Sequence, residues 1–94
     1  MKFNTELKSD EFILIGSWKI VNGNVVSDEV CQRIENLIDN YLKKVSTEKT
    51  GWEILYQDKN DNRYWLLTFP KSDWHGGGPP TLKMLTEVEV SEKF

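Results

Sequence analysis

The chain has 94 residues, enough for one domain (1–94) around a single hydrophobic core and too few for two such domains. Twelve Lys and Arg against fifteen Asp and Glu give a formal net charge of −3, which disfavours binding to a nucleic-acid backbone and suits a basic protein partner. A single cysteine excludes an internal disulfide and indicates a reducing compartment.

The N-terminal segment, residues 1–10, is polar and lacks the apolar core of a signal peptide. The following run, Phe12-Ile13-Leu14-Ile15, is too short to span a bilayer. We therefore expect a cytoplasmic protein without a membrane segment.

Residues 12–21 are rich in Ile, Leu, Val and Trp, and they predict a strand. Asn22-Gly23 follows, and such a pair between two apolar runs is typical of a tight hairpin turn, because both residues tolerate φ > 0. A hairpin is therefore expected over residues 13–27.

An amphipathic helix is predicted over residues 28–45, with Ser27 or Asp28 as its N-cap. Acidic residues at its start and lysines at its end complement the helix dipole. Its apolar stripe consists of Val30, Cys31, Ile34, Leu37, Ile38, Tyr41, Leu42 and Val45.

Further strands are expected at residues 52–57, 63–69 and 81–85, and apolar residues on both faces of the second indicate a central strand. Thr86 and Glu89 have the spacing of a capping box and predict a short C-terminal helix, although the alternation of residues 88–90 also suits a strand. Together the elements predict an α+β fold. It would have a mostly antiparallel sheet of four to five strands with one amphipathic helix, about 28–45, packed on one face.

The segment from His75 to Pro80 predicts a loop of defined, irregular shape, because its glycines admit φ > 0 and its prolines restrict the chain. No Gly-Lys-Ser or Gly-Lys-Thr follows, and proline lacks the N–H that a phosphate would need, so a structural or partner-contact role is favoured over cofactor binding. The residues interpreted as a structural loop are Gly76, Gly77, Gly78, Pro79 and Pro80.

No catalytic or metal site is predicted. His75 and Cys31 are the only histidine and cysteine, and Cys31 lies on the apolar stripe, so we expect its thiol to be buried and inert. Asp58, Asn60 and Asn62 have the spacing of the first positions of a calcium loop, but the later Gly and Glu of that loop are absent, and a polar Asx turn is favoured. We expect no enzyme activity and no cofactor.

A small RNA-binding or enzymatic α+β domain is the alternative. Aromatic residues on strands can stack single-stranded RNA, but residues 63–67 offer only one arginine, and we expect no nucleic-acid partner. The acidic residues could include a general acid–base pair, but no nucleophile, base and orienting group occur together in the sequence.

Several short motifs occur in a fixed order along the chain: Asp28-Glu29-Val30-Cys31-Gln32-Arg33-Ile34-Glu35, Gly51-Trp52-Glu53, Tyr56, Asp58, Asp61, Arg63-Tyr64-Trp65, Pro70-Lys71-Ser72 and His75-Gly76-Gly77-Gly78-Pro79-Pro80. In the order and spacing of these motifs, the chain resembles the immunity protein 27 family from about residue 16 to the C-terminus. Proteins of this family accompany bacterial polymorphic toxins, including those of contact-dependent growth inhibition systems. The chain departs from the expected pattern at Lys59, Asn62 and Leu66.

The resemblance implies a non-catalytic inhibitor that binds and neutralises a cognate toxin domain in the cytoplasm. A nuclease is the leading candidate toxin, because its nucleic-acid groove would be basic and would attract an acidic partner. We expect exposed acidic residues and an aromatic anchor at the interface. The candidate toxin-binding residues are Glu53, Asp58, Asp61, Asp73, Trp74 and His75.

Overall fold

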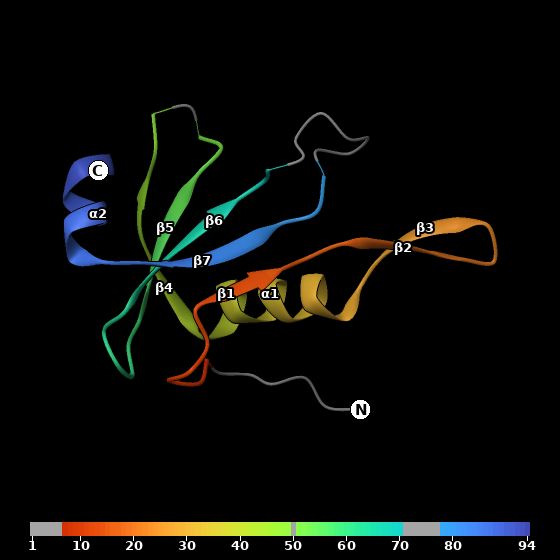
Figure 1. The fold of residues 1–94 in the computed structure, drawn as a ribbon, viewed down its shortest axis with the longest axis horizontal. Coiled ribbons are helices and arrows are strands. Elements are labelled where there is room, and N and C mark those ends of the chain that lie inside the picture. Colours follow the sequence, from red (N-terminus) through yellow and green to blue (C-terminus); the bar gives the residue numbers. More distant parts are fainter. Residues whose placement is uncertain (1–6, 50, 71–77) are drawn as a thin grey trace.

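A computed structural model describes residues 7–49, 51–70 and 78–94, and it confirms the α+β class. A five-stranded antiparallel sheet has the order β1-β7-β6-β5-β4, and β2 and β3 form a separate two-stranded ribbon. Figure 1 shows how the elements are arranged. In chain order they are β1 (Ile13–Ile15), β2 (Trp18–Val21), β3 (Asn24–Ser27), α1 (Glu29–Asn40), β4 (Leu42–Thr47), β5 (Ile54–Asp58), β6 (Tyr64–Thr68), β7 (Thr81–Leu85) and α2 (Glu87–Lys93).

The strand β6 lies in the middle of the five-stranded sheet, as its two apolar faces predicted. Trp65 and Leu67 point to the face that α1 covers, whereas Leu66 points to the opposite face. All three side chains are buried, so the sheet has apolar contacts on both sides. The larger core lies under α1, as expected, where Ile34 and Leu37 are 0% exposed.

The helix α2 lies on the face of the sheet opposite to α1. Its N-terminus has the predicted capping box, because the Thr86 hydroxyl accepts from Glu89 N and the Glu89 carboxylate accepts from Thr86 N. The strand alternative for residues 88–90 is therefore wrong. Val90 joins a small cluster with Leu55, Leu66 and Leu85, so α2 covers one end of this face.

The predicted helix of residues 28–45 is too long, because α1 ends at Asn40. Its predicted N-cap is confirmed, since the Asp28 carboxylate accepts a hydrogen bond of 2.8 Å from Cys31 N. Apolar residues at positions 41, 42 and 45 fit a helix stripe, but here the chain turns at Tyr41 and continues as β4. Pairing with β5 satisfies the backbone of this segment, and Val45 lies 46% exposed at a register shift.

The predicted strand of residues 12–21 breaks at Gly16. β1 pairs with β7, and Gly16 N donates a 2.8 Å hydrogen bond to Pro80 O before the chain leaves the sheet. A Cβ on Gly16 would lie 2.6 Å from both Cys31 Sγ and Pro80 O, so only glycine fits without displacing the backbone. The predicted turn is confirmed, since Asn22 and Gly23 have φ of 51° and 79°, and the β2–β3 ribbon projects from the body (Figure 1).

Two arginines fasten the N-terminal segment to the rest of the fold. The guanidinium of Arg33 donates two hydrogen bonds, of 2.6 and 2.7 Å, to the carboxylate of Glu11. Arg63 donates to the main-chain oxygens of Glu11 and Lys8 at 2.6 and 2.8 Å. These contacts hold Leu7, which is 5% exposed, within the core under α1.

The Glu11–Arg33 pair should make stability depend on pH below 5. Its hydrogen bonds lower the pKa of the Glu11 carboxyl from 4.5 to about 2, so the folded state favours the ionised form. This contribution is complete above pH 4.5 and is lost as the pH falls towards 2. We expect Glu11→Gln to be less stable than the natural protein by about 1–2 kcal/mol at pH 7, a value reduced for solvent screening.

Urea unfolding of both proteins between pH 7 and pH 2 measures this difference. The gap between their free energies of unfolding should close as the pH approaches 2, because Glu11 is then losing its charge. A gap that stays constant over this range would contradict the assignment.

Candidate functional site

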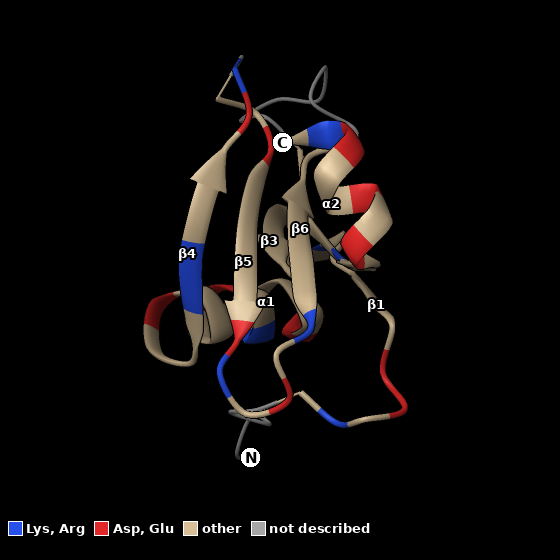
Figure 2. Ribbon diagram, turned by 90° about the vertical axis from the view of Figure 1, so that its left-hand side faces the viewer, with Lys and Arg blue, Asp and Glu red and all other residues tan. Residues whose placement is uncertain are grey.

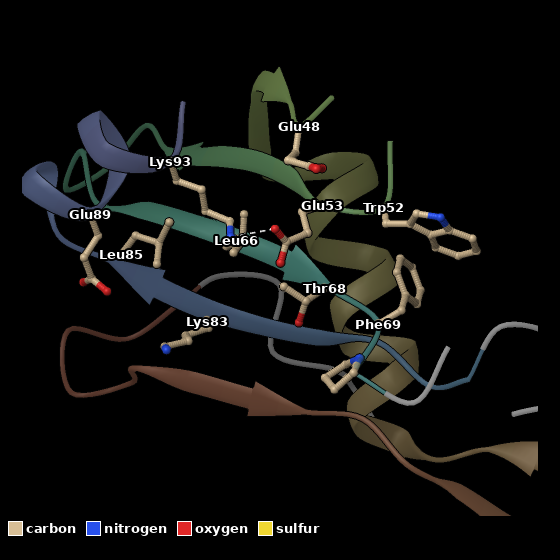
Figure 3. A pocket seen from close by; sticks show the side chains of 11 residues that line it. Glu48, Trp52, Glu53, Leu66, Thr68, Phe69, Lys83, Leu85, Glu89 and Lys93 are labelled. Atoms are coloured by element: carbon tan, nitrogen blue, oxygen red, sulfur yellow. Dashed lines mark ion pairs between the residues drawn. The ribbon is translucent and has the colours of Figure 1, made fainter. Parts of the chain in front are cut away.

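A groove crosses the part of the sheet that α2 leaves uncovered. Its volume is about 570 Å³, and it lies between the start of β5, the end of β6 and the C-terminal end of α2 (Figure 3). A second hollow of about 380 Å³ adjoins it on the side of β1, and the two share Thr68, Pro70 and Lys83. We call the two together the sheet groove.

The floor of the sheet groove is mostly apolar, with Thr68 as a polar member. Leu66 and Leu85 line it next to α2, and Trp52 and Phe69 lie side by side at its other end (Figure 3). The indole of Trp52 is 58% exposed although it is the largest type of side chain in the protein. From the edge strand β1, Ile13 and Ile15 add two further exposed apolar side chains, 47% and 62% accessible.

The rim of the sheet groove is charged and more acidic than basic. Glu48, Glu53 and Glu89 line it together with Lys83 and Lys93. Lys93 Nζ lies 2.7 Å from Glu53 Oε1, and this hydrogen bond raises the pKa of the lysine. The Glu89 carboxylate accepts a hydrogen bond from Thr86 N, and its contacts with Thr86 lower the pKa of this carboxyl below its ordinary value.

The structure separates the predicted toxin-binding residues. Glu53 lies in the sheet groove, before the start of β5, whereas Asp61 lies in the turn beyond the other end of β5 and is paired with Arg63 at 2.6 Å. Asp73, Trp74 and His75 lie outside the described residues. Of the candidate set, only Glu53 is therefore seen in the sheet groove.

The prediction that Asp58 is an exposed acidic residue is wrong. Its side chain is 0% exposed, and its carboxylate accepts hydrogen bonds from Tyr41 Oη at 3.0 Å and from Asn60 N at 2.8 Å. The second bond is that of an Asx turn, the interpretation favoured over a calcium loop, and Asn62 completes the turn with φ of 65°. Asp58 fixes the turn between β5 and β6 and anchors it to Tyr41.

The predicted structural loop is described only in its last three residues. Gly78 has φ of 78°, as expected for a glycine in this loop, and Gly78 and Pro79 are buried. Pro80 accepts the hydrogen bond from Gly16 and so connects the loop to the end of β1. Gly76 and Gly77 lie outside the described residues.

Sequence reasoning missed Trp52 as a surface residue. The sequence pattern predicted that Trp52 begins a strand over residues 52–57, but β5 begins only at Ile54 and the tryptophan precedes it. The signal that could have identified it is Gly51, whose φ of 80° turns the chain just before the tryptophan. Phe69, Ile13, Ile15, Lys83 and Lys93 were also not predicted at a site.

Cys31 is 1% exposed, so its predicted burial is confirmed. The thiol donates a weak hydrogen bond of 3.3 Å to Ser17 O, and burial together with the nearby Asp28 raises its pKa. Its inertness stays a prediction. We expect iodoacetamide to label the native protein on the order of 100-fold more slowly than the urea-unfolded protein at the same pH, because the thiolate is disfavoured and shielded. Equal rates in the two states would contradict this.

Within residues 7–49, 51–70 and 78–94, no group of three or more His, Cys, Asp or Glu could hold a metal ion. No helix in the described part of the chain is long and apolar enough to cross a membrane. The geometry of the sheet groove, with an apolar floor and a charged rim, is suited to contact with a macromolecule.

Comparison with protein-family models gives a match over most of the chain. The family model described as Immunity protein 27 matches residues 20–86, which is more than half of the chain and runs from β2 to the N-cap of α2. No curated protein and no solved structure matches the chain. The matched range contains Trp52, Glu53, Phe69 and Lys83 of the sheet groove.

Proposed function

The chain belongs to the immunity protein 27 family, and from this membership we propose that it neutralises the cognate toxin domain of a bacterial polymorphic toxin system by direct, non-catalytic binding. The proposal includes a cytoplasmic site of action and a toxin of the kind used in contact-dependent growth inhibition. The toxin we favour is a nuclease with a basic surface.

The sheet groove is the surface that best suits this role. Protein interfaces combine an apolar centre with a polar rim, and aromatic residues often carry much of their binding energy. Trp52 and Phe69 would supply the aromatic anchors, and the charged rim would surround them. A standard interface buries about 800 Å² on each partner, which is about one-eighth of the 6385 Å² that this chain exposes.

The charge on this side of the molecule supports a basic partner. The helix α2 carries Glu87, Glu89 and Glu92, which Figure 2 shows as red segments beside the sheet. Glu48 and Glu53 extend the acidic rim at the start of β5. Complementary charge would steer the encounter, so added salt should slow association much more than it speeds dissociation.

Co-expression tests the proposal. The toxin domain encoded beside this gene is produced in bacteria with or without this protein, and survival and co-purification are measured. We expect survival only when both are produced, and a complex with nanomolar or tighter affinity, about −12 kcal/mol or better. Equal killing with and without the protein would contradict the proposal, as would catalysis or RNA binding by the purified protein alone.

A further inference from the structure

An ion pair of the chain itself crosses the sheet groove. Lys93 Nζ lies 2.7 Å from Glu53 Oε1, and both residues line the groove. Lys93 is in the last turn of α2 and Glu53 lies just before β5, so the lysine side chain extends from the helix towards the start of that strand (Figure 3). The pair therefore lies between Leu85 at one end of the floor and Trp52 at the other.

The carboxylate of this pair is on a fixed segment, whereas the ammonium is on a flexible side chain. The main-chain oxygen of Glu53 accepts a 2.8 Å hydrogen bond from Glu48 N, which holds the start of β5 in place. None of the seven residues of α2 is buried, and Lys93 is at its C-terminal end, far from the capping box. A lysine side chain has several rotatable bonds. The ammonium can therefore leave Glu53 by side-chain rotation alone, without movement of α2.

The pair is weak enough to be exchanged for another. The side chains of Lys93 and Glu53 are 39% and 28% exposed, and ion pairs with such access to solvent stabilise a protein only slightly. The same carboxylate would attract a cation more strongly once a partner excludes water from the groove. The hydrogen bond to Glu53 raises the pKa of Lys93, and the charge of Glu48 adds to this effect. The rim therefore favours a cation at Glu53.

We propose that Lys93 occupies, in the free protein, the position at Glu53 that a lysine or arginine of the toxin takes in the complex. The inference rests on the proposed function and names the chemical group that the toxin must present at this point. An approaching cation is repelled by Lys93 as long as the ammonium stays at Glu53, so Lys93 must turn to solvent when the toxin docks. A partner without a cation here would displace Lys93 and leave Glu53 unpaired, so the exchange selects the cognate toxin.

Lys83 provides a matched comparison for Lys93. It lines the same groove and carries the same charge, but it belongs to β7, and its side chain points away from Glu53 (Figure 3). Neutralising Lys83 therefore changes the total charge of the groove without freeing Glu53. Any effect that is specific to Lys93 must appear as a difference between the two lysine variants.

Binding kinetics with the toxin domain encoded beside this gene test the inference. Removal of either lysine charge should speed association with a basic toxin. Lys93→Gln should in addition bind about fivefold more tightly than Lys83→Gln, because only Lys93 competes for the carboxylate. Glu53→Gln should weaken binding at least tenfold, about 1.4 kcal/mol of binding free energy. In the Glu53→Gln background the two lysine variants should bind equally, since no carboxylate is left to compete for.

NMR titration of the lysine side chains tests the free protein without the toxin. Because Glu53 raises the pKa of Lys93, Glu53→Gln should lower it. An unchanged pKa would show that the pair does not form and would overturn the inference. Amide exchange of α2 should be the same in Lys93→Gln and Lys83→Gln. Faster exchange in Lys93→Gln alone would assign its tighter binding to opening of the helix and would also overturn the inference.

The binding data separate failure of this inference from failure of the proposed function. Equal affinities of Lys93→Gln and Lys83→Gln would overturn the inference. Weaker binding by Lys93→Gln would do the same, by showing that the lysine itself contacts the toxin. In both cases the natural protein still binds, and the proposed function stands. If the natural protein does not bind the toxin domain, the proposed function is wrong and this inference fails with it.

Discussion

Replacing Arg63 by alanine should lower the free energy of unfolding by about 3–5 kcal/mol, because one side chain joins three parts of the fold. Its guanidinium donates to Lys8 O and Glu11 O, at 2.8 and 2.6 Å, and its Nε donates to Asp61 at 2.6 Å. It also lies 5.0 Å from the ring centroid of Trp65, in the core under α1. Loss of the guanidinium would leave two main-chain oxygens without this donor.

Thermal and urea unfolding measure the loss of stability. One further variant shows whether the geometry or the charge of Arg63 is responsible, and a second serves as a control. Arg63→Lys keeps the charge but not the planar set of donors, so it should recover only a small part of the stability. Lys59→Ala, in the same turn but exposed, should change the free energy of unfolding by less than about 0.5 kcal/mol.

Hydrogen exchange locates the effect. In Arg63→Ala the amides of residues 8–12 should exchange faster than those of β6, because the N-terminal segment loses its attachment to the sheet. Normal stability together with unchanged protection of residues 8–12 would show that Arg63 does not have this role.

The features that the sequence predicted well are set by residues close together in the chain. Asn22-Gly23 specifies its turn through the φ angles that both residues adopt, and Thr86 and Glu89 specify the cap of α2. The same holds for Asp28 and the start of α1. Each of these predictions can be made without knowing which residues pack against the segment.

The end of α1 could not be predicted in this way. Tyr41, Leu42 and Val45 fit the helical stripe, but they are equally compatible with a strand when another strand is available to pair with. That strand is β5, and residues 42–47 pair with it across the sheet. Tertiary pairing therefore decided the conformation of a segment for which the local pattern was ambiguous.

The candidate site was harder still, because it is assembled from distant segments. The sheet groove joins residues of β1, β6, β7 and α2, which are brought together only when the sheet has formed. Exposure is the decisive property of an interface residue, and it cannot be read from residue type. Asp58 is buried although it is acidic, and Trp52 is exposed although it is aromatic.

Replacing Trp52 by alanine should weaken binding of the toxin about 100-fold, equivalent to about 2.7 kcal/mol of binding free energy. The expectation rests on the proposed function and on the position of the indole at the end of the sheet groove, beside Phe69. Because the side chain is 58% exposed in the free protein, its truncation should change the free energy of unfolding little.

Phe12→Ala is the matched control for Trp52→Ala. Phe12 is 59% exposed, almost the same fraction as Trp52, but it does not line either hollow of the sheet groove. Isothermal titration or surface plasmon resonance with the purified toxin domain should show natural affinity for Phe12→Ala and a faster dissociation rate for Trp52→Ala. If both variants bind and protect cells as the natural protein does, the toxin docks elsewhere, and the sheet groove loses its assignment while the immunity function stands. If neither the natural protein nor its variants bind, the immunity function itself fails, so the two failures are distinguishable in one experiment.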